Sequence, residues 1–171
     1  GRLRRAVEQP ESDQGTQALE LGDVLRRAVY LLEPEAKRLG IVINMQSAEP
    51  VWVLADSVAL DQIVHNLLMN AFQALESSNA EPKRMQINTA QSGQFGELRV
   101  ADNGAGIADE VLPRLFEPFF STREGGLGLG LSLCETLAQG MGGEISAGNQ
   151  ATGGAEFTLK LPLSKQQTPS T

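Results

Sequence analysis

Two asparagines, Asn66 and Asn70, stand four residues apart in the segment DQIVHNLLMNAFQAL. On a helix this spacing places both side chains on one side, about 40° apart around the axis. Asparagine is a poor helix former, so two of them inside an apolar helix need a reason. One reason is structural, a pair of buried amides satisfied by neighbouring backbone. The other is functional: the amide oxygens face a cleft and hold a hard cation with its phosphates.

An acidic residue, Asp102, ends an apolar segment and is followed at once by a turn that carries Gly104 and Gly106, with Ile107 after them. A carboxylate can accept a hydrogen bond from an exocyclic amine, and glycine backbone lets a flat ring approach closely. The same letters also fit an ordinary surface turn. The pattern therefore indicates either a turn or a binding site for a flat, amine-bearing ring.

A glycine-rich segment, GGLGLGLSL, places Gly126, Gly128 and Gly130 just before a predicted helix. Free backbone N–H groups and the positive end of a helix converge there, where a phosphate can sit. The GxGxG spacing after a loop differs from the dinucleotide fingerprint, and no GKS or GKT of a P-loop is present. Arg123, ahead of the glycines, is placed either to reach a terminal phosphate or to lie in solvent as an ordinary loop charge.

Charge and composition exclude several classes of function. The chain has 171 residues with 14 basic and 21 acidic side chains, a net charge of −7, so we expect one domain that does not bind nucleic acid or anionic membranes nonspecifically. One cysteine and one histidine exclude an internal disulfide framework and a zinc-type cluster, and a reducing compartment fits this composition. No apolar run approaches the roughly 20 residues that span a bilayer.

Periodicity predicts the elements that position these residues. Apolar residues at helical spacing predict helices over 23–39, ending at Gly40, and over 57–75, capped by Asp56. Further helices are expected over 109–116 and 129–141.

Strands are predicted in three hairpin pairs, 41–47 with 51–55, 85–90 with 97–103, and 143–149 with 155–163. Helices between strand pairs predict an α+β fold: a two-layer α/β sandwich with a mixed, mostly antiparallel sheet and helices on one face. Residues 1–20 are predicted to be a linker, 21–163 the domain, and 164–171 a disordered tail.

In this order the segments resemble the catalytic, ATP-binding domain of bacterial two-component sensor histidine kinases, in the superfamily shared with DNA gyrase, MutL and the ninety-kilodalton heat-shock chaperones. NLLMNA is similar to the N box, DNGAGI to the first glycine box, FEPFFSTR to the F box and GLGLGLSL to the second glycine box. The resemblance covers roughly 21–163. It implies a Bergerat-type sandwich that binds ATP and Mg²⁺, with a lid over the phosphates.

The resemblance also implies residue roles. Asp102 would accept from the adenine amine, Asn70 would ligate Mg²⁺, and Thr158 would support Asp102 through water. Asn66 and Arg123 are the implied catalytic residues. The ATP-binding set that it implies is Asn66, Asn70, Asp102, Gly104, Gly106, Ile107, Phe119, Gly126, Gly128, Gly130, Leu131 and Thr158.

One position bears on the reaction. Relatives that hydrolyse ATP commonly carry glutamate four residues before the magnesium asparagine, where this chain has Asn66. An amide cannot take a proton at neutral pH, so phosphate transfer to a histidine is favoured over hydrolysis. The alternatives are a non-catalytic nucleotide-binding interaction module and, less favoured, an ATP hydrolase of the gyrase or MutL kind.

The resemblance implies partners as well. The acceptor histidine of such kinases lies on a two-helix dimerisation domain, and no histidine precedes His65 in this chain. We therefore expect a fragment of a longer kinase, monomeric by itself and a homodimer at full length. Its expected partners are its own dimerisation and phosphoacceptor domain and a response regulator. We expect a cytoplasmic location, and the sequence leaves open whether the full-length protein is anchored in the inner membrane.

Overall fold

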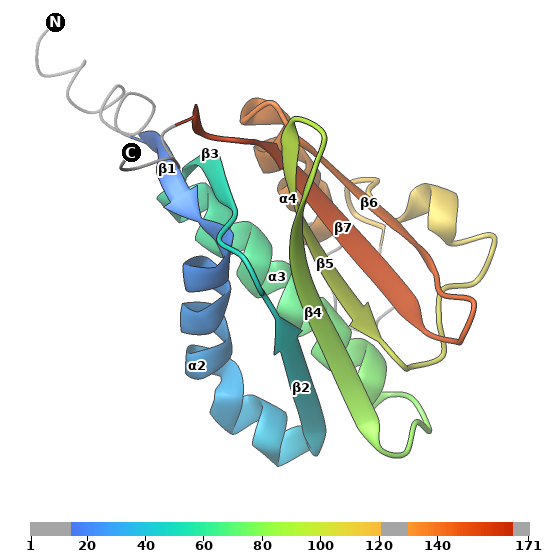
Figure 1. Cartoon of the computed structure of the whole chain (residues 1–171). Helices are drawn as coiled ribbons and strands as arrows, with labels where there is room; N and C mark the ends of the chain where they lie inside the picture. The colour runs from blue at the N-terminus through green and yellow to red at the C-terminus, as the bar shows by residue number, and fades with distance from the viewer. Residues whose placement is uncertain (1–14, 121–129, 166–171) are drawn as a thin grey trace, which may run out of the picture.

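The structure, a computed structural model, describes residues 15–120 and 130–165, which form two layers (Figure 1). Helices cover one face of a five-stranded sheet with the strand order β2-β4-β5-β7-β6. β2 and β4 are parallel and the other neighbours are antiparallel, so the predicted mixed, mostly antiparallel sheet is confirmed. The elements are β1 (Thr16–Glu20), α2 (Leu21–Leu39), β2 (Ile41–Gln46), β3 (Trp52–Asp56), α3 (Ser57–Glu76), β4 (Lys83–Ser92), β5 (Phe95–Asp102), the 3-10 turn η1 (Leu112–Arg114), α4 (Gly130–Gly140), β6 (Glu144–Asn149) and β7 (Ala155–Pro162).

The central helix, α3, forms as its sequence predicts. The Asp56 carboxylate accepts a hydrogen bond from the Ala59 N–H at 2.8 Å, which caps the free donors of the first turn. The apolar residues of this helix that are buried are Leu60, Ile63, Val64, Leu67, Leu68, Ala71, Phe72 and Leu75. They fix the rotation of the helix, so Asn66 and Asn70 lie at the side of the apolar face and are half-buried. Within 15–120 and 130–165, no helix is long and apolar enough to cross a membrane.

The predicted hairpin of 41–47 with 51–55 is wrong. β2 pairs with β4 in the main sheet, while β3 pairs with β1 in a separate two-stranded sheet. The strand β1 lies where the sequence predicts a linker. The buried Glu20 carboxylate explains the arrangement, because it accepts from the N–H groups of Gly22, at 3.0 Å, and Val51, at 2.9 Å. It therefore ties the start of α2 to the segment before β3.

The other two strand pairs are hairpins, as predicted. β4 and β5 are joined through Gly93, which has a φ of 62°, and β6 and β7 pair from Asn149 opposite Ala155. The helix predicted over 109–116 is only the 3-10 turn η1, because Pro113 lacks an N–H and cannot continue an α-helix. At the other end Ser164, predicted to be in the tail, is buried and donates its N–H to the Trp52 carbonyl at 2.9 Å.

Candidate functional site

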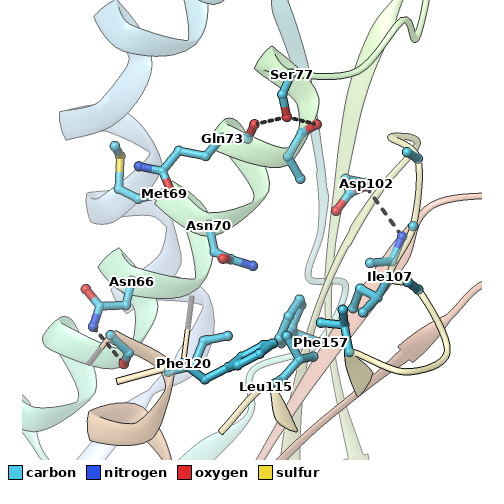
Figure 2. A pocket seen from close by; sticks show the side chains of 18 of the residues that line it. Asn66, Met69, Asn70, Gln73, Ser77, Asp102, Ile107, Leu115, Phe120 and Phe157 are labelled. Atoms are coloured by element: carbon cyan, nitrogen blue, oxygen red, sulfur yellow. Dashed lines mark hydrogen bonds between the residues drawn. The ribbon is translucent and has the colours of Figure 1, made fainter. Parts of the chain in front are cut away.

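A pocket of about 780 Å³ lies between α3 and the turn that follows β5. Figure 2 shows Asn66 and Asn70 along one wall, on α3, and Asp102 and Ile107 on the opposite wall. The start of α4 and the start of β7 complete the lining. The volume falls within the range of roughly 300–1,000 Å³ that is usual for sites of small ligands and cofactors.

Asp102, the last residue of β5, is the buried acid of the pocket. Its side chain is held through Oδ1, which accepts from the N–H groups of Gly104, at 2.8 Å, and Ala155, at 3.4 Å. Among the described residues none donates to Oδ2. Burial raises the pKa of Asp102, although the two backbone N–H groups act in the opposite direction. A desolvated carboxylate oxygen favours a ligand with an N–H donor and repels a ligand carbonyl.

The two glycines of the turn, Gly104 and Gly106, have different roles. Gly106 lines the pocket with a φ of 85°, a conformation that side chains rarely adopt. Gly104 does not line the pocket. A Cβ there would lie 3.1 Å from the Asp102 carboxylate and 3.3 Å from the Ala74 carbonyl oxygen, so its absence lets the turn close over the end of α3. The expected close approach of a flat ring therefore applies to Gly106, while Gly104 holds the acid.

Asn66 and Asn70 occupy the opposite end of the pocket. Asn66 donates through Nδ2 to the Gly130 carbonyl at 3.3 Å and so joins α3 to the first residue of α4. The Cys134 thiol lies next to it, and burial raises the pKa of this thiol to about 11, against the effect of its hydrogen bond with Asn66. The thiol is therefore protonated at neutral pH and is no nucleophile.

Asn70 lies one turn further along α3 and reaches into the pocket (Figure 2). Its carboxamide oxygen is a hard ligand that suits Mg²⁺. The described residues contain no cluster of three His, Cys, Asp or Glu side chains that could hold a metal ion by themselves. A single amide oxygen fits Mg²⁺ only where phosphate oxygens and waters supply the remaining ligands, as is usual for this ion at nucleotide sites.

Several predicted residues are brought together, and others are not. Gly130 and Leu131 line the pocket beside the asparagines. Phe119 does not; its side chain is 78% exposed, and Phe120 lines the pocket in its place. Arg123, Gly126 and Gly128 lie outside the described residues.

The prediction for Thr158 is wrong. Side chains alternate along a strand, and in β7 it is Ala155 and Phe157 that face the pocket. Thr158 is therefore on the other face of the sheet, opposite Arg99 and Ser146 in the neighbouring strands. No water bridge from Thr158 is needed, because the Ala155 N–H contacts Asp102 directly.

The sequence reading missed His65, Met69, Gln73 and Phe157, all of which line the pocket. Met69 and Gln73 follow Asn66 and Asn70 by three residues each, so the helical period could have identified them. Phe157 follows Ala155 by two residues on the same face of β7, and no sequence signal identifies either of them as part of the site.

The fold and the site together define an ATP-binding α/β sandwich, with a buried acid at one end of the pocket and amides at a helix N-terminus at the other. The chain belongs to the histidine kinase-, DNA gyrase B- and HSP90-like ATPase family, whose model matches residues 55–165. Among curated proteins it is similar to the C4-dicarboxylate transport sensor protein DctS of Rhodobacter capsulatus, with 32% identity over 90% of this chain and 23% of DctS. It is also 40% identical to the C4-dicarboxylate transport sensor protein DctB of Pseudomonas aeruginosa, over 66% of this chain and 18% of DctB.

Solved structures of histidine kinases have the same fold as this chain. The catalytic domain of the histidine kinase ThkA superposes with a TM-score of 0.77 at 26% identity, over 86% of this chain and 95% of that one. Full-length ShkA in complex with AMPPNP superposes with a TM-score of 0.75 at 31% identity, over 87% of this chain and 31% of ShkA. These matches confirm the predicted family, the two-layer fold and the ATP-binding catalytic role. The chain spans less than a quarter of the curated relatives named above, 23% and 18%.

Proposed function

We propose that this chain, within a longer sensor kinase, binds ATP in the pocket and transfers its γ-phosphate to a histidine on a separate dimerisation and phosphoacceptor domain. The observation that carries the proposal is the pairing of two unlike ends in one pocket. Asp102 is a buried acceptor for a base amine, while Asn66 donates to Gly130 at the start of α4, and Asn70 lines the pocket one turn further along α3. A nucleotide has this same polarity, with an amine at one end and phosphates at the other.

At the base end, recognition depends on Asp102. Its Oδ2 atom accepts a hydrogen bond from the exocyclic amine of adenine, while guanine would present a carbonyl oxygen to the same carboxylate. Ile107 and Phe157 provide apolar surface for the ring. This end therefore selects ATP over GTP by charge and by shape.

At the phosphate end, the N-terminus of α4 directs backbone donors at Gly130 and Leu131 toward the ligand. Asn70 is the residue that would hold Mg²⁺ between the protein and the phosphate oxygens. When bound, Mg²⁺ neutralises part of the charge on the phosphates. Asn66 positions the phosphate end through its bond to Gly130, so we assign it the catalytic part of orienting the γ-phosphate.

The same residue argues for transfer instead of hydrolysis. The Asn66 amide has no basic atom at neutral pH, and its Nδ2 group already donates to Gly130. It cannot take a proton from water. In the transfer step the bond from the γ-phosphorus to the bridging oxygen of ATP breaks, ADP leaves with that oxygen, and a phosphorus–nitrogen bond to the imidazole forms.

The remaining partners and the location of the longer protein are proposals that rest on the family. We infer that the longer protein is a homodimer, that its phosphohistidine supplies a response regulator, and that this domain works in the cytoplasm, where ATP is available. The net charge of −7 argues against nucleic acid as a partner.

The direct test is phosphotransfer. The chain is incubated with radiolabelled ATP and Mg²⁺ together with the dimerisation domain of its own longer protein, and acid-labile phosphate on that domain is measured. We expect phosphohistidine with the wild-type chain, and at most about a hundredth of that rate with Asp102→Asn, because the base is no longer held. Steady release of inorganic phosphate without phosphohistidine would support a hydrolase. Magnesium-independent nucleotide binding without either product would support an interaction module.

A further inference from the structure

The hairpin between β6 and β7 lies against the turn that follows β5, and one of its side chains binds that turn at two points. The Asn149 Oδ1 atom accepts from the Ile107 N–H at 2.7 Å, and its Nδ2 group donates to the Ile107 carbonyl at 2.7 Å. One carboxamide thus satisfies both backbone groups of one residue that is 42 positions away in the chain. Asn149 is not part of the pocket lining; it acts on a residue that is.

The same hairpin also holds Asp102. The Gln150 side chain donates from Nε2 to the Asp102 carbonyl at 3.0 Å. Gly154, with a φ of 90°, packs so closely on the Asp102 backbone that a Cβ there would overlap with the Asp102 carbonyl oxygen. The hairpin therefore fixes both residues that form the base end of the pocket, the acid and the apolar residue beyond it.

The Asn149 contact contributes more to position than to folding. Asn149 is exposed, and β6 and β7 are already paired through their own backbone from Asn149 opposite Ala155. By contrast, Gly106 and Ile107 belong to no helix or strand, so regular backbone pairing does not place them. Without Asn149, water could satisfy the two Ile107 groups, but water would not hold them at one distance from Asp102.

We propose that Asn149 is a positioning residue for base recognition: it clamps Ile107, and with it Gly106, at the distance from Asp102 that fits an aminopurine ring. This inference rests on the proposed function, because it concerns the base end of the same pocket. Asn149 touches neither the base nor the phosphates. Its loss should widen the slot for the ring, weaken adenine binding and reduce the preference for adenine over guanine.

The test uses Asn149→Ala and Asn149→Asp, with Thr152→Ala as the matched control, since Thr152 is exposed in the same hairpin and does not line the pocket. Affinities for ADP and GDP are measured by calorimetry without Mg²⁺, which leaves the metal out of the comparison. We expect Asn149→Ala to bind ADP about tenfold more weakly, since two hydrogen bonds that hold the ring slot are lost. The ratio of ADP to GDP affinity should fall, while the thermal midpoint stays within about 2 °C of wild type.

The ADP affinity of Asn149→Asp should lie between those of wild type and Asn149→Ala. A carboxylate keeps the acceptor for the Ile107 N–H but faces the Ile107 carbonyl with a second oxygen. A second readout, hydrogen exchange of the Ile107 amide in the nucleotide-free chain, should be faster in Asn149→Ala and unchanged in Thr152→Ala.

Two results would overturn the inference: an unchanged exchange rate at Ile107, or a loss of affinity in Asn149→Ala that is equal for ADP and GDP. A failure of the proposed function would give a different experimental result. In that case the wild-type chain binds no ADP, while the exchange measurement still decides whether Asn149 clamps Ile107.

Discussion

The two ends of the pocket are built in different ways. At the base end, Asp102 is 4% exposed, and its side chain and carbonyl are bound by groups from the next turn and from the β6–β7 hairpin. At the phosphate end, Asn66 and Asn70 project from the surface of α3 and are half-buried. Asn66 joins α3 to α4 there, through the Gly130 carbonyl at 3.3 Å and through the Cys134 thiol.

This difference indicates which end of the pocket is formed before binding and which end gains its final geometry when the ligand binds. Strand pairing positions Asp102, and the β6–β7 hairpin holds the turn with Ile107, so the base end is formed before any ligand arrives. Little ordering is needed there on binding, and this end should set affinity and base selectivity. The phosphate end offers one amide oxygen for a metal and a helix N-terminus, so it should gain its final geometry with Mg²⁺ and phosphates. Variants at the base end should therefore lose nucleotide affinity with or without Mg²⁺, whereas variants at the phosphate end should lose only the part of the affinity that depends on Mg²⁺.

The largest effect is expected at the base end. Asp102→Asn should weaken ADP binding about 100-fold, or ~2.7 kcal/mol, because a charged acceptor for the adenine amine is replaced by an amide that can turn its NH₂ toward the ring. Calorimetry with ADP measures this directly. The matched control is Asp109→Asn, which removes the same charge from an exposed position in the adjoining loop. Equal ADP affinities for Asp102→Asn and the control would show that Asp102 does not contact the nucleotide.

The second prediction tests the close packing that prepares the base end. Gly154→Ala should destabilise the chain by about 3–5 kcal/mol, because the new Cβ overlaps with the Asp102 carbonyl and the residue has a positive φ. Gly153→Ala is the matched control, since Gly153 also has a positive φ, 107°, but has open space around it. It should cost only about 1–2 kcal/mol. Urea unfolding of the two variants gives the difference in the free energy of unfolding. Equal losses of stability would show that the close packing of Gly154 on Asp102 is not needed for the fold.

The third prediction concerns the phosphate end. Asn70→Ala should weaken binding of ADP about tenfold when Mg²⁺ is present and leave binding in EDTA nearly unchanged, because only the metal ligand is removed. Asn44→Ala, an exposed asparagine on the edge strand β2, serves as the control. Equal weakening with and without Mg²⁺ would place Asn70 in contact with the nucleotide itself and not with the metal.

The smallest effect is on stability and depends on pH. Because burial raises the pKa of Asp102 in the folded chain, the ionised acid destabilises the fold at neutral pH. Asp102→Asn, despite its loss of binding, should therefore melt a few degrees higher than wild type at pH 7. The gain should shrink as the pH falls through the raised pKa and vanish below about 3.8, the ordinary value, where both states carry the proton. A variant that is less stable at pH 7 would contradict this.

The local parts of this site could be predicted from sequence. Asn66 and Asn70 share one side of a helix because of their spacing, and Asp102 ends an apolar strand, so short-range periodicity was enough to identify them. The helices α2, α3 and α4, the two later hairpins and the layer architecture follow from the same signals, whereas the helix predicted over 109–116 is only a 3-10 turn.

The parts that the sequence could not predict depend on pairing between distant segments. The strand β3 pairs with β1, and Glu20 binds Val51 beside this pair, a contact that no local pattern encodes. The resemblance implies that Thr158 supports Asp102, but the buried Phe157 fixes the face of β7, and a shift of one residue sends a side chain to the opposite side. The contact of Asn149 with Ile107 likewise exists only after two separate hairpins have docked.

The most direct test of a nucleotide that spans two unlike ends is a titration by ¹H–¹⁵N NMR, first with adenosine and then with Mg²⁺ and ADP. Adenosine should shift the backbone amides of Gly104, Ile107 and Ala155 and leave the side-chain amides of Asn66 and Asn70 in place. Mg²⁺ and ADP should then shift those side-chain amides as well. If adenosine moved the asparagine side chains while Gly104, Ile107 and Ala155 stayed unchanged, the assignment of base to Asp102 and phosphates to α3 would be contradicted.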